Sequence, residues 1–237
     1  MRTYTELAKA DHNVVKLVDE LATIKGSPEV YRHQMHEIGK HLAEGVLKSL
    51  KSSTSNICVV CTVEDADFLA RGLIERLEEY GFGSRVRLIC LWNAKIRELD
   101  VSLSPITREY KETLDAEATD FIIVKSIISG ACVVKTNLTK AISLARPHQI
   151  YVAAPVLLEG AEKRLAREFP YEISNKFEFV HFAVDTEKEG ENVIPGIGGS
   201  VYELLGLGNS KEKNKYVPKL VKERRAKFFG APLLTHA

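Results

Sequence analysis

The sequence predicts a mixed α/β fold, in which a mostly parallel sheet is flanked by helices. Short apolar runs rich in β-branched residues recur along the chain, and buried parallel strands have this composition. Segments with helical spacing alternate with these runs, which favours crossover connections and parallel pairing of the strands. The chain has 237 residues, of which 45% are hydrophobic and 27% charged, so it is long enough to bury a sizeable core.

The overall charge argues against a strong electrostatic attraction to nucleic acid or to membrane surfaces, because the formal net charge is only +1. No apolar run approaches the ~20 residues of a membrane span, and the first residues lack the apolar core of a signal peptide. Four cysteines lie in or beside apolar runs, where thiols are usually buried and reduced: Cys58, Cys61, Cys90 and Cys132. We therefore expect a cytoplasmic protein with no membrane partner.

Two helices are expected in residues 1–50, and we expect them to pack on the core. The first covers residues 3–24 and ends at the Lys-Gly-Ser-Pro sequence of residues 25–28. Ser27 is suited to cap a second helix with Pro28 in its first turn, and this helix extends to about residue 49. Its apolar positions recur at helical spacing: Tyr31, Met35, Ile38, Leu42 and Val46.

The opposite side of the second helix carries His33, His36 and His41, together with Glu37 and Glu44. Three imidazoles with carboxylates on one helical face are able to bind a metal ion. A solvated face fits the periodicity better, because polar residues normally cover the side opposite an apolar stripe. We therefore predict no metal site here, and the role of the histidines stays open.

The core domain is expected at residues 51–208. Its strands are predicted at residues 57–61, 86–92, 119–124, 150–154 and 177–184, the last strand of the sheet. Its helices are predicted at residues 68–80, 133–145 and 159–168. Residues 93–111 are expected to be irregular because they are too polar for the core, and a glycine-rich loop at 194–199 precedes a helical segment at 200–205.

Ligands of open parallel sheets bind at the carboxyl ends of the strands, and four loops are expected to meet there: 62–67, 93–105, 125–132 and 194–200. In one of these loops, Ser129, Gly130 and Ala131 lie between a buried strand and a helix. A small-residue loop before a helix exposes backbone N–H groups that can bind an anion. An ordinary strand-to-helix connection explains the same residues equally well.

Cys58 and Cys61 have the spacing of zinc ligands. Residues three apart on one strand point to opposite faces of the sheet, which argues against a shared metal. Cys61 and Cys132 belong to different ligand loops, and whether these two thiols approach each other stays open.

Residues 209–237 form a tail that is basic up to Lys227 and then apolar. Val217, Leu220 and Val221 have the spacing of a short amphipathic helix. A basic run is usually only a solvated face, but apolar side chains beyond it are harder to leave in water: Phe228, Phe229, Leu233 and Leu234. We therefore favour docking of the tail on a protein partner or a neighbouring subunit over binding of nucleic acid.

Several segments resemble uracil phosphoribosyltransferase. The most specific is VIPGIGGSVYELLG at residues 193–206, which is similar to the family's Ile-Pro-Gly-Leu-Gly-Asp-Ala-Gly-Asp signature. IYVAAPVLLEGAEKRL at 150–165 and FAVD, which ends at Asp185, occur in the family's order, so the resemblance covers most of residues 28–208. It implies a type I phosphoribosyltransferase fold, whose enzymes use magnesium to join the ribose of phosphoribosyl diphosphate to a base and release diphosphate.

The resemblance also implies where ligands lie. The base is held by backbone groups at Ile194, Gly196 and Gly198. The ribose and its phosphate lie against the loop after the strand at 119–124, here Lys125, Ser129, Gly130, Ala131 and Cys132. The diphosphate lies against the position of Glu64 and Asp65.

The side chains that carry charge in that family are changed in this sequence. Lys125 stands where the family has an acidic residue. The family's diphosphate loop has an Arg-Ala-Gly core, and this sequence has Val63, Glu64 and Asp65 at that place. The two aspartates of the family signature are replaced by Gly199 and Tyr202. Diphosphate needs cations and magnesium needs carboxylates, so each exchange weakens the hold on the donor and its metal.

Three functions follow as hypotheses. The leading one is a uracil-phosphoribosyltransferase-like protein without ordinary transferase activity, which binds a nucleotide or pyrimidine as a regulatory or assembly module. The alternative is a divergent transferase, in which Glu64, Asp65 and Asp67 hold magnesium and Lys125 reaches a phosphate. The third is an RNA-binding regulator on the same fold. Relatives in the family form oligomers, so we also expect a homo-oligomer.

Overall fold

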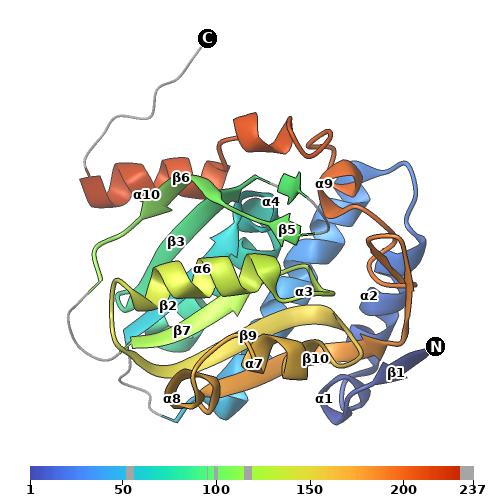
Figure 1. Cartoon of the computed structure of the whole chain (residues 1–237), viewed down its shortest axis with the longest axis horizontal. Coiled ribbons are helices and arrows are strands. Elements are labelled where there is room, and N and C mark those ends of the chain that lie inside the picture. Colours follow the sequence, from blue (N-terminus) through green and yellow to red (C-terminus); the bar gives the residue numbers. More distant parts are fainter. Residues whose placement is uncertain (52–55, 95, 99–100, 115–118, 230–237) are drawn as a thin grey trace.

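One mostly parallel sheet forms the centre of the fold. The computed structural model describes residues 1–51, 56–94, 96–98, 101–114 and 119–229, and within these ranges eight strands join in this sheet (Figure 1). Their order is β1 (Arg2–Tyr4), β10 (Phe177–Asp185), β9 (Pro147–Leu158), β7 (Thr119–Val124), β2 (Asn56–Thr62), β3 (Val86–Asn93) and β6 (Ile106–Lys111), with β8 (Ile127–Ile128) on β9. The strands from β10 to β3 pair in parallel, whereas the outer strands β1 and β6 are antiparallel.

Helices cover both faces of this sheet, which confirms the predicted fold class (Figure 1). One face packs against α2 (His12–Thr23), α3 (Pro28–Ser49), α4 (Val63–Asp65) and α5 (Arg71–Leu77), with the π-helical turns η1 (Ala66–Ala70) and η2 (Glu78–Phe82) on either side of α5. The other face packs against α6 (Cys132–Ile142), α7 (Ala161–Ala166) and α8 (Tyr171–Ser174). The remaining elements lie around the sheet: α1 (Glu6–Lys9), α9 (Val201–Leu204), η3 (Lys213–Lys215), α10 (Lys219–Phe229), the hairpin β4 (Ile96–Glu98) with β5 (Val101–Leu103), and the hairpin β11 (Glu187–Glu189) with β12 (Asn192–Ile194).

The side chains of β2 alternate between the two cores, as the period of a strand requires. Val59 and Cys61 pack on the α3 and α5 side, whereas Cys58 and Val60 pack on the α6 side. The two cysteines of the Cys-x-x-Cys pair therefore point away from each other, as predicted.

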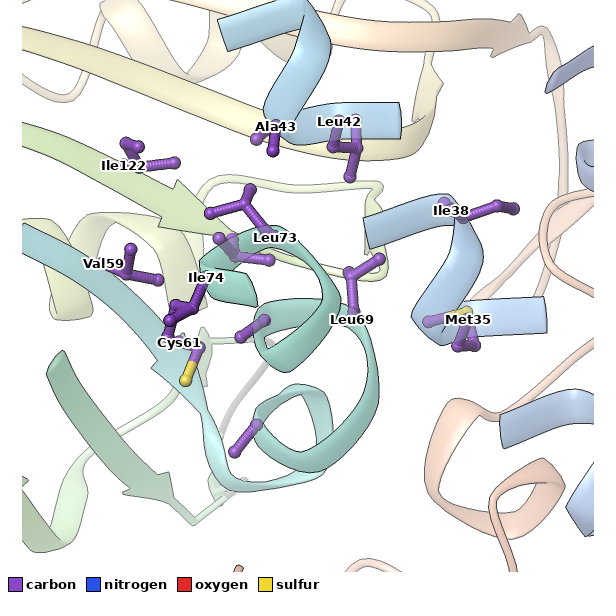
Figure 2. Close-up of a cluster of buried hydrophobic side chains, with 14 of the residues drawn as sticks. Met35, Ile38, Leu42, Ala43, Val59, Cys61, Leu69, Leu73, Ile74 and Ile122 are labelled. Carbon is purple, nitrogen blue, oxygen red and sulfur yellow. The ribbon is translucent and has the colours of Figure 1, made fainter. Parts of the chain in front are cut away.

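The long helix α3 packs closely on the segment after β2. Its predicted apolar positions are all buried, and Met35, Ile38 and Leu42 face Leu69 and Leu73 in the core (Figure 2). Two glycines let the helix backbones approach, because a Cβ atom at Gly39 would lie 2.1 Å from the Leu69 carbonyl oxygen. One at Gly72 would lie 2.0 Å from the carbonyl oxygen of His36. Neither position has room for a larger residue.

Three predictions about secondary structure were wrong. Residues 3–24 form part of an edge strand and two helices instead of one helix. The Thr5 side chain accepts a hydrogen bond from Ala8 N, and the Asp11 side chain accepts one from Asn13 N. Each of these side chains therefore caps the start of a new helix. Residues 93–111 contain β4, β5 and β6, because an edge strand such as β6 keeps one face in water and tolerates polar residues. The loop expected at residues 62–67 is helical from Val63 onward, in α4 and the start of η1, because acidic residues favour the N-terminus of a helix. β10 is the last strand of the central sheet in chain order, as predicted, and the β11–β12 hairpin forms a separate sheet.

The close helix contact predicts a sharp difference between two glycine substitutions. Gly72→Ala should lower the free energy of unfolding by about 2–3 kcal/mol, because its methyl group overlaps the His36 backbone and the helices must separate. Urea denaturation followed by circular dichroism measures the change.

Gly83→Ala is the matched control. Its backbone is right-handed helical, at φ −54° and ψ −38°, and the nearest heavy atom to an added methyl is Glu78 Cγ at 3.5 Å. This variant should stay within about 1 kcal/mol of the parent. Equal effects of the two substitutions would contradict the close-contact explanation.

Candidate functional site

A buried ion cluster lies at the carboxyl ends of β2 and β7. Lys125 directly follows β7, and its ammonium donates to Asp65 Oδ2 at 2.6 Å and lies 3.3 Å from Glu64 Oε1. Both acids belong to α4, which begins directly after β2. The structure therefore brings together Lys125, which was predicted at the ribose and phosphate position, and Glu64 and Asp65, which were predicted at the diphosphate position. The charges of the lysine and the acids neutralise each other.

A second lysine enters the same cluster from a distant part of the chain. Lys213 of η3 donates to Glu64 Oε2 at 2.9 Å, and its ammonium lies 5.8 Å from the centre of the Tyr202 ring. Glu64, Asp65, Lys125 and Lys213 thus form two carboxylates facing two ammonium groups, a set that we call the ion cluster. The side chain of Lys213 is only 6% exposed and that of Glu64 only 7%.

Further hydrogen bonds fix the acids of the ion cluster. Asp65 accepts from the Thr62 hydroxyl at 2.6 Å and from the Ser126 backbone N–H at 3.2 Å. Burial alone would raise the pKa of Glu64, but Lys125 and Lys213 outweigh it and hold that pKa at about 2. Burial opposes the charged form of Lys125, yet Asp65 and Glu64 raise its pKa above its ordinary value. Glu64 and Lys125 are thus held in their charged forms at neutral pH.

The predicted phosphate loop, residues 129–132, follows Lys125 of the cluster in the sequence and leads into α6. Gly130 is exposed and has open space around it, and Ser129, Ala131 and Cys132 are partly exposed. Arg164 of α7 donates to the Ser129 carbonyl oxygen at 3.3 Å. Cys132 contacts the Ser104 hydroxyl at 3.4 Å, on the segment between β5 and β6.

The predicted base loop is braced by an ion pair that the sequence analysis missed. Arg2 pairs with Asp185 at the end of β10, through Nη2 and Oδ2 at 2.8 Å, and Gly196 N donates to the same carboxylate at 2.8 Å. Gly196 has φ +57°, and an added Cβ there would lie 2.3 Å from the Val193 carbonyl oxygen. Tyr31 donates its hydroxyl to the Ile197 carbonyl oxygen at 3.0 Å. Gly198 also has positive φ, whereas the side chain of Ile194 is exposed.

The other candidate groups are used in ordinary contacts. His36 Nε2 lies 2.8 Å from Glu75 on α5, and His41 Nδ1 lies 3.3 Å from Glu44. Burial raises the pKa of Cys58 well above its ordinary value. In the described part of the chain, no group of three or more His, Cys, Asp or Glu side chains is arranged to hold a metal ion. The same residues contain no helix that is long and apolar enough to cross a membrane.

Part of the predicted tail packs on its own chain. Leu220 and Val221 of α10 are buried in the core, whereas Phe228 and Phe229 are 37% and 57% exposed. Leu233 and Leu234 lie outside the described residues.

Comparison with known proteins gives a likeness in fold. No protein-family model and no curated protein matches the chain. The AQ2163 protein of Aquifex aeolicus has a similar structure, with a TM-score of 0.62 and 15% identity over 81% of this chain and 93% of that chain. At this identity the likeness is one of fold alone.

Structures of two phosphoribosyltransferases are also similar. Adenine phosphoribosyltransferase of Thermoanaerobacter pseudethanolicus has a TM-score of 0.41 and 10% identity, over 61% of this chain and 80% of that chain. Hypoxanthine phosphoribosyltransferase of Staphylococcus aureus has a TM-score of 0.42 and 14% identity, over 65% and 74%. Scores at this level carry no argument about function, so the function has to be argued from the residues of the site.

The ion cluster predicts a large effect from removing one charge. Lys125→Met should lower the free energy of unfolding by about 3–5 kcal/mol, because it leaves Asp65 buried opposite no ammonium. The double variant Lys125→Met with Asp65→Asn should lose clearly less than the sum of the two single variants. Chemical denaturation of the four proteins gives this coupling.

An exposed ion pair provides the control. Lys135 and Glu168 are paired at the surface, with side chains 49% and 38% exposed. Lys135→Met should cost less than about 1 kcal/mol. Additive single and double variants at Lys125 and Asp65 would show that the two charges are not coupled.

Proposed function

We propose that this chain is a phosphoribosyltransferase-like protein without ordinary transferase activity. It binds a nucleotide or a pyrimidine and acts as a regulatory or assembly module. The observation that carries this proposal is the ion cluster, which occupies the position expected for the diphosphate of the donor with the chain's own lysines and carboxylates.

The charge balance of the cluster explains why transfer chemistry should be lost. Diphosphate carries several negative charges, so its site has to present an excess of positive charge. Here Lys125 and Lys213 are already neutralised by Glu64 and Asp65. A donor molecule would have to separate buried ion pairs and then face two carboxylates, which would oppose its binding. A transferase depends mainly on electrostatic stabilisation of the leaving diphosphate, and this corner supplies no net positive charge for it.

The parts of the site that depend on backbone groups support binding of a smaller ligand. Gly130 is exposed in front of the 11-residue helix α6, where N–H groups and the helix dipole favour a phosphate. The loop from Ile194 to Gly198 keeps the sequence that the resemblance assigns to the base, and Asp185 and Tyr31 hold its backbone. A pyrimidine nucleotide has a phosphate for the loop at Gly130 and a base for the loop from Ile194 to Gly198.

The first test is turnover. The purified protein is incubated with phosphoribosyl diphosphate, magnesium and uracil, and diphosphate and UMP are measured; adenine and hypoxanthine replace uracil in parallel. We expect no product at enzymatic rates of about 1–1000 per second. Product formation at such rates would reject the proposal in favour of a divergent transferase, in which the ion cluster opens to hold magnesium.

The second test is binding of UMP, measured by calorimetry. Gly130→Asp should weaken binding about tenfold or more, because it places a negative charge at the predicted phosphate position. A Cβ atom added at Gly130 meets nothing within 4 Å and the residue is exposed, so the fold should be unaffected.

Asn175→Asp is the control variant, because it adds the same charge at an exposed position after α8. It should leave UMP binding unchanged. Failure of the parent protein to bind UMP, or equal loss in both variants, would contradict nucleotide binding at this loop.

A further inference from the structure

We propose that residues 209–216 form a gating strap, a segment that closes over the ion cluster and opens without unfolding the helix that follows it. The strap connects α9 to α10 and crosses above α4 at the carboxyl ends of the strands (Figure 1). The inference rests on the proposed function only in taking the ion cluster as part of the ligand site, at the position expected for the diphosphate.

Polar contacts hold the strap down, and its Tyr216 also packs against the core. Lys213 reaches inward to Glu64 at 2.9 Å, and the Tyr216 hydroxyl donates to Asp67. The Trp92 indole N–H donates to the Tyr216 carbonyl oxygen at 2.9 Å. The partners of these contacts are side chains of the sheet or of the segment after β2. The strap itself contains no strand and only the short turn η3.

The residues at the two ends of the strap are suited to limit an opening motion to the strap itself. Upstream, Gly206 and Gly208 have φ +69° and +75°, a conformation that glycine adopts without strain and that suits a hinge. Downstream, Asp67 accepts hydrogen bonds from Lys219 N at 2.8 Å and Leu220 N at 2.7 Å, which caps α10. The same helix is fixed farther along, because Arg224 binds Glu112 through two nitrogen atoms at 2.6 and 2.9 Å.

The closed strap leaves two polar groups unsatisfied. Asn214 donates from Nδ2 to the Asn93 carbonyl oxygen at 3.3 Å. Within the described part of the chain, however, the side-chain oxygens of Asn93 and Asn214 are buried with no hydrogen-bond partner. Burying such a group has a free-energy cost, which water would remove on opening. The closed state is therefore stabilised less than its ion pair alone implies, which lowers the free energy needed for local opening.

The strap controls access because its lysine is part of the ion cluster. While Lys213 is in place, Glu64 has an ammonium group on each side, one from Lys125 and one from the strap. When the strap opens, Glu64 and Lys125 become accessible to solvent together. A cation that approaches Glu64 must displace the chain's own ammonium group from it, which makes the strap an autoinhibitory contact.

Trp92 is the single tryptophan of the chain and is 2% exposed, so it reports on the strap directly. Lys213→Met removes the inner contact and should raise the acrylamide quenching constant of Trp92 fluorescence roughly threefold or more. Lys215→Met is the matched control, because it removes the same charge from an exposed position of the same turn. It should leave quenching unchanged, and equal quenching of the two variants would overturn the proposal.

Amide hydrogen exchange of the parent protein is the second measurement, and it needs no variant to fold. The amides of residues 209–216 should exchange through a local opening that depends little on denaturant, and faster than the amides of α10. If the strap and α10 exchange together, with the denaturant dependence of global unfolding, then the strap is a fixed part of the fold and the proposal is wrong. Neither readout uses turnover or UMP, so this outcome is independent of the tests of function.

Discussion

The contact between Lys125 and the carboxylates after β2 is the interaction on which the candidate site depends. In a medium from which water is excluded, an ammonium and a carboxylate 2.6 Å apart are stable only as a complete set, because each isolated charge would be strongly disfavoured. That requirement explains the hydrogen bonds of Thr62 and Ser126 to Asp65, and the arrival of Lys213 at Glu64. The cluster therefore fixes the relative positions of the ends of β2 and β7, and it binds the strap in its closed position.

This arrangement also separates two properties that occur together in a transferase, namely the shape of the site and its charge. The shape is provided by the parallel strands and by loops whose backbone is constrained, as at Gly196. The charge is provided by side chains, and here these side chains bind one another. The function that we propose depends on this separation, because it needs loops that bind a ligand but not the electrostatic stabilisation that catalysis requires.

Much of the fold was predictable from the sequence, because it follows from the period of apolar residues. The stripe from Tyr31 to Val46 and the run from Phe121 to Val124 are buried as expected. The errors arose where local hydrogen bonds override that period. Thr5 caps a new helix within a segment that reads as one helix, and no apolar spacing reveals this.

The site was only partly predictable, for a different reason. Lys125, Glu64 and Asp65 stand at strand ends, so a parallel sheet brings them to one edge. Lys213 and Arg2 could not be placed in this way, because each lies in a polar terminal segment and its partner is far away in the sequence. Their only signal was a charge, and most charges of such segments are solvated.

The distant position of Lys213 has a consequence for the order in which the molecule assembles. Its partner Glu64 lies 149 residues earlier in the chain, whereas Lys125 and Asp65 are separated by only 60. Contacts between residues close in sequence form with less loss of chain entropy. The strands β7 and β2, which precede Lys125 and Asp65, can therefore pair before Lys213 arrives. Until then Glu64 faces water, and the corner stays hydrated. By this argument, expulsion of that water follows the pairing of β2 with β7.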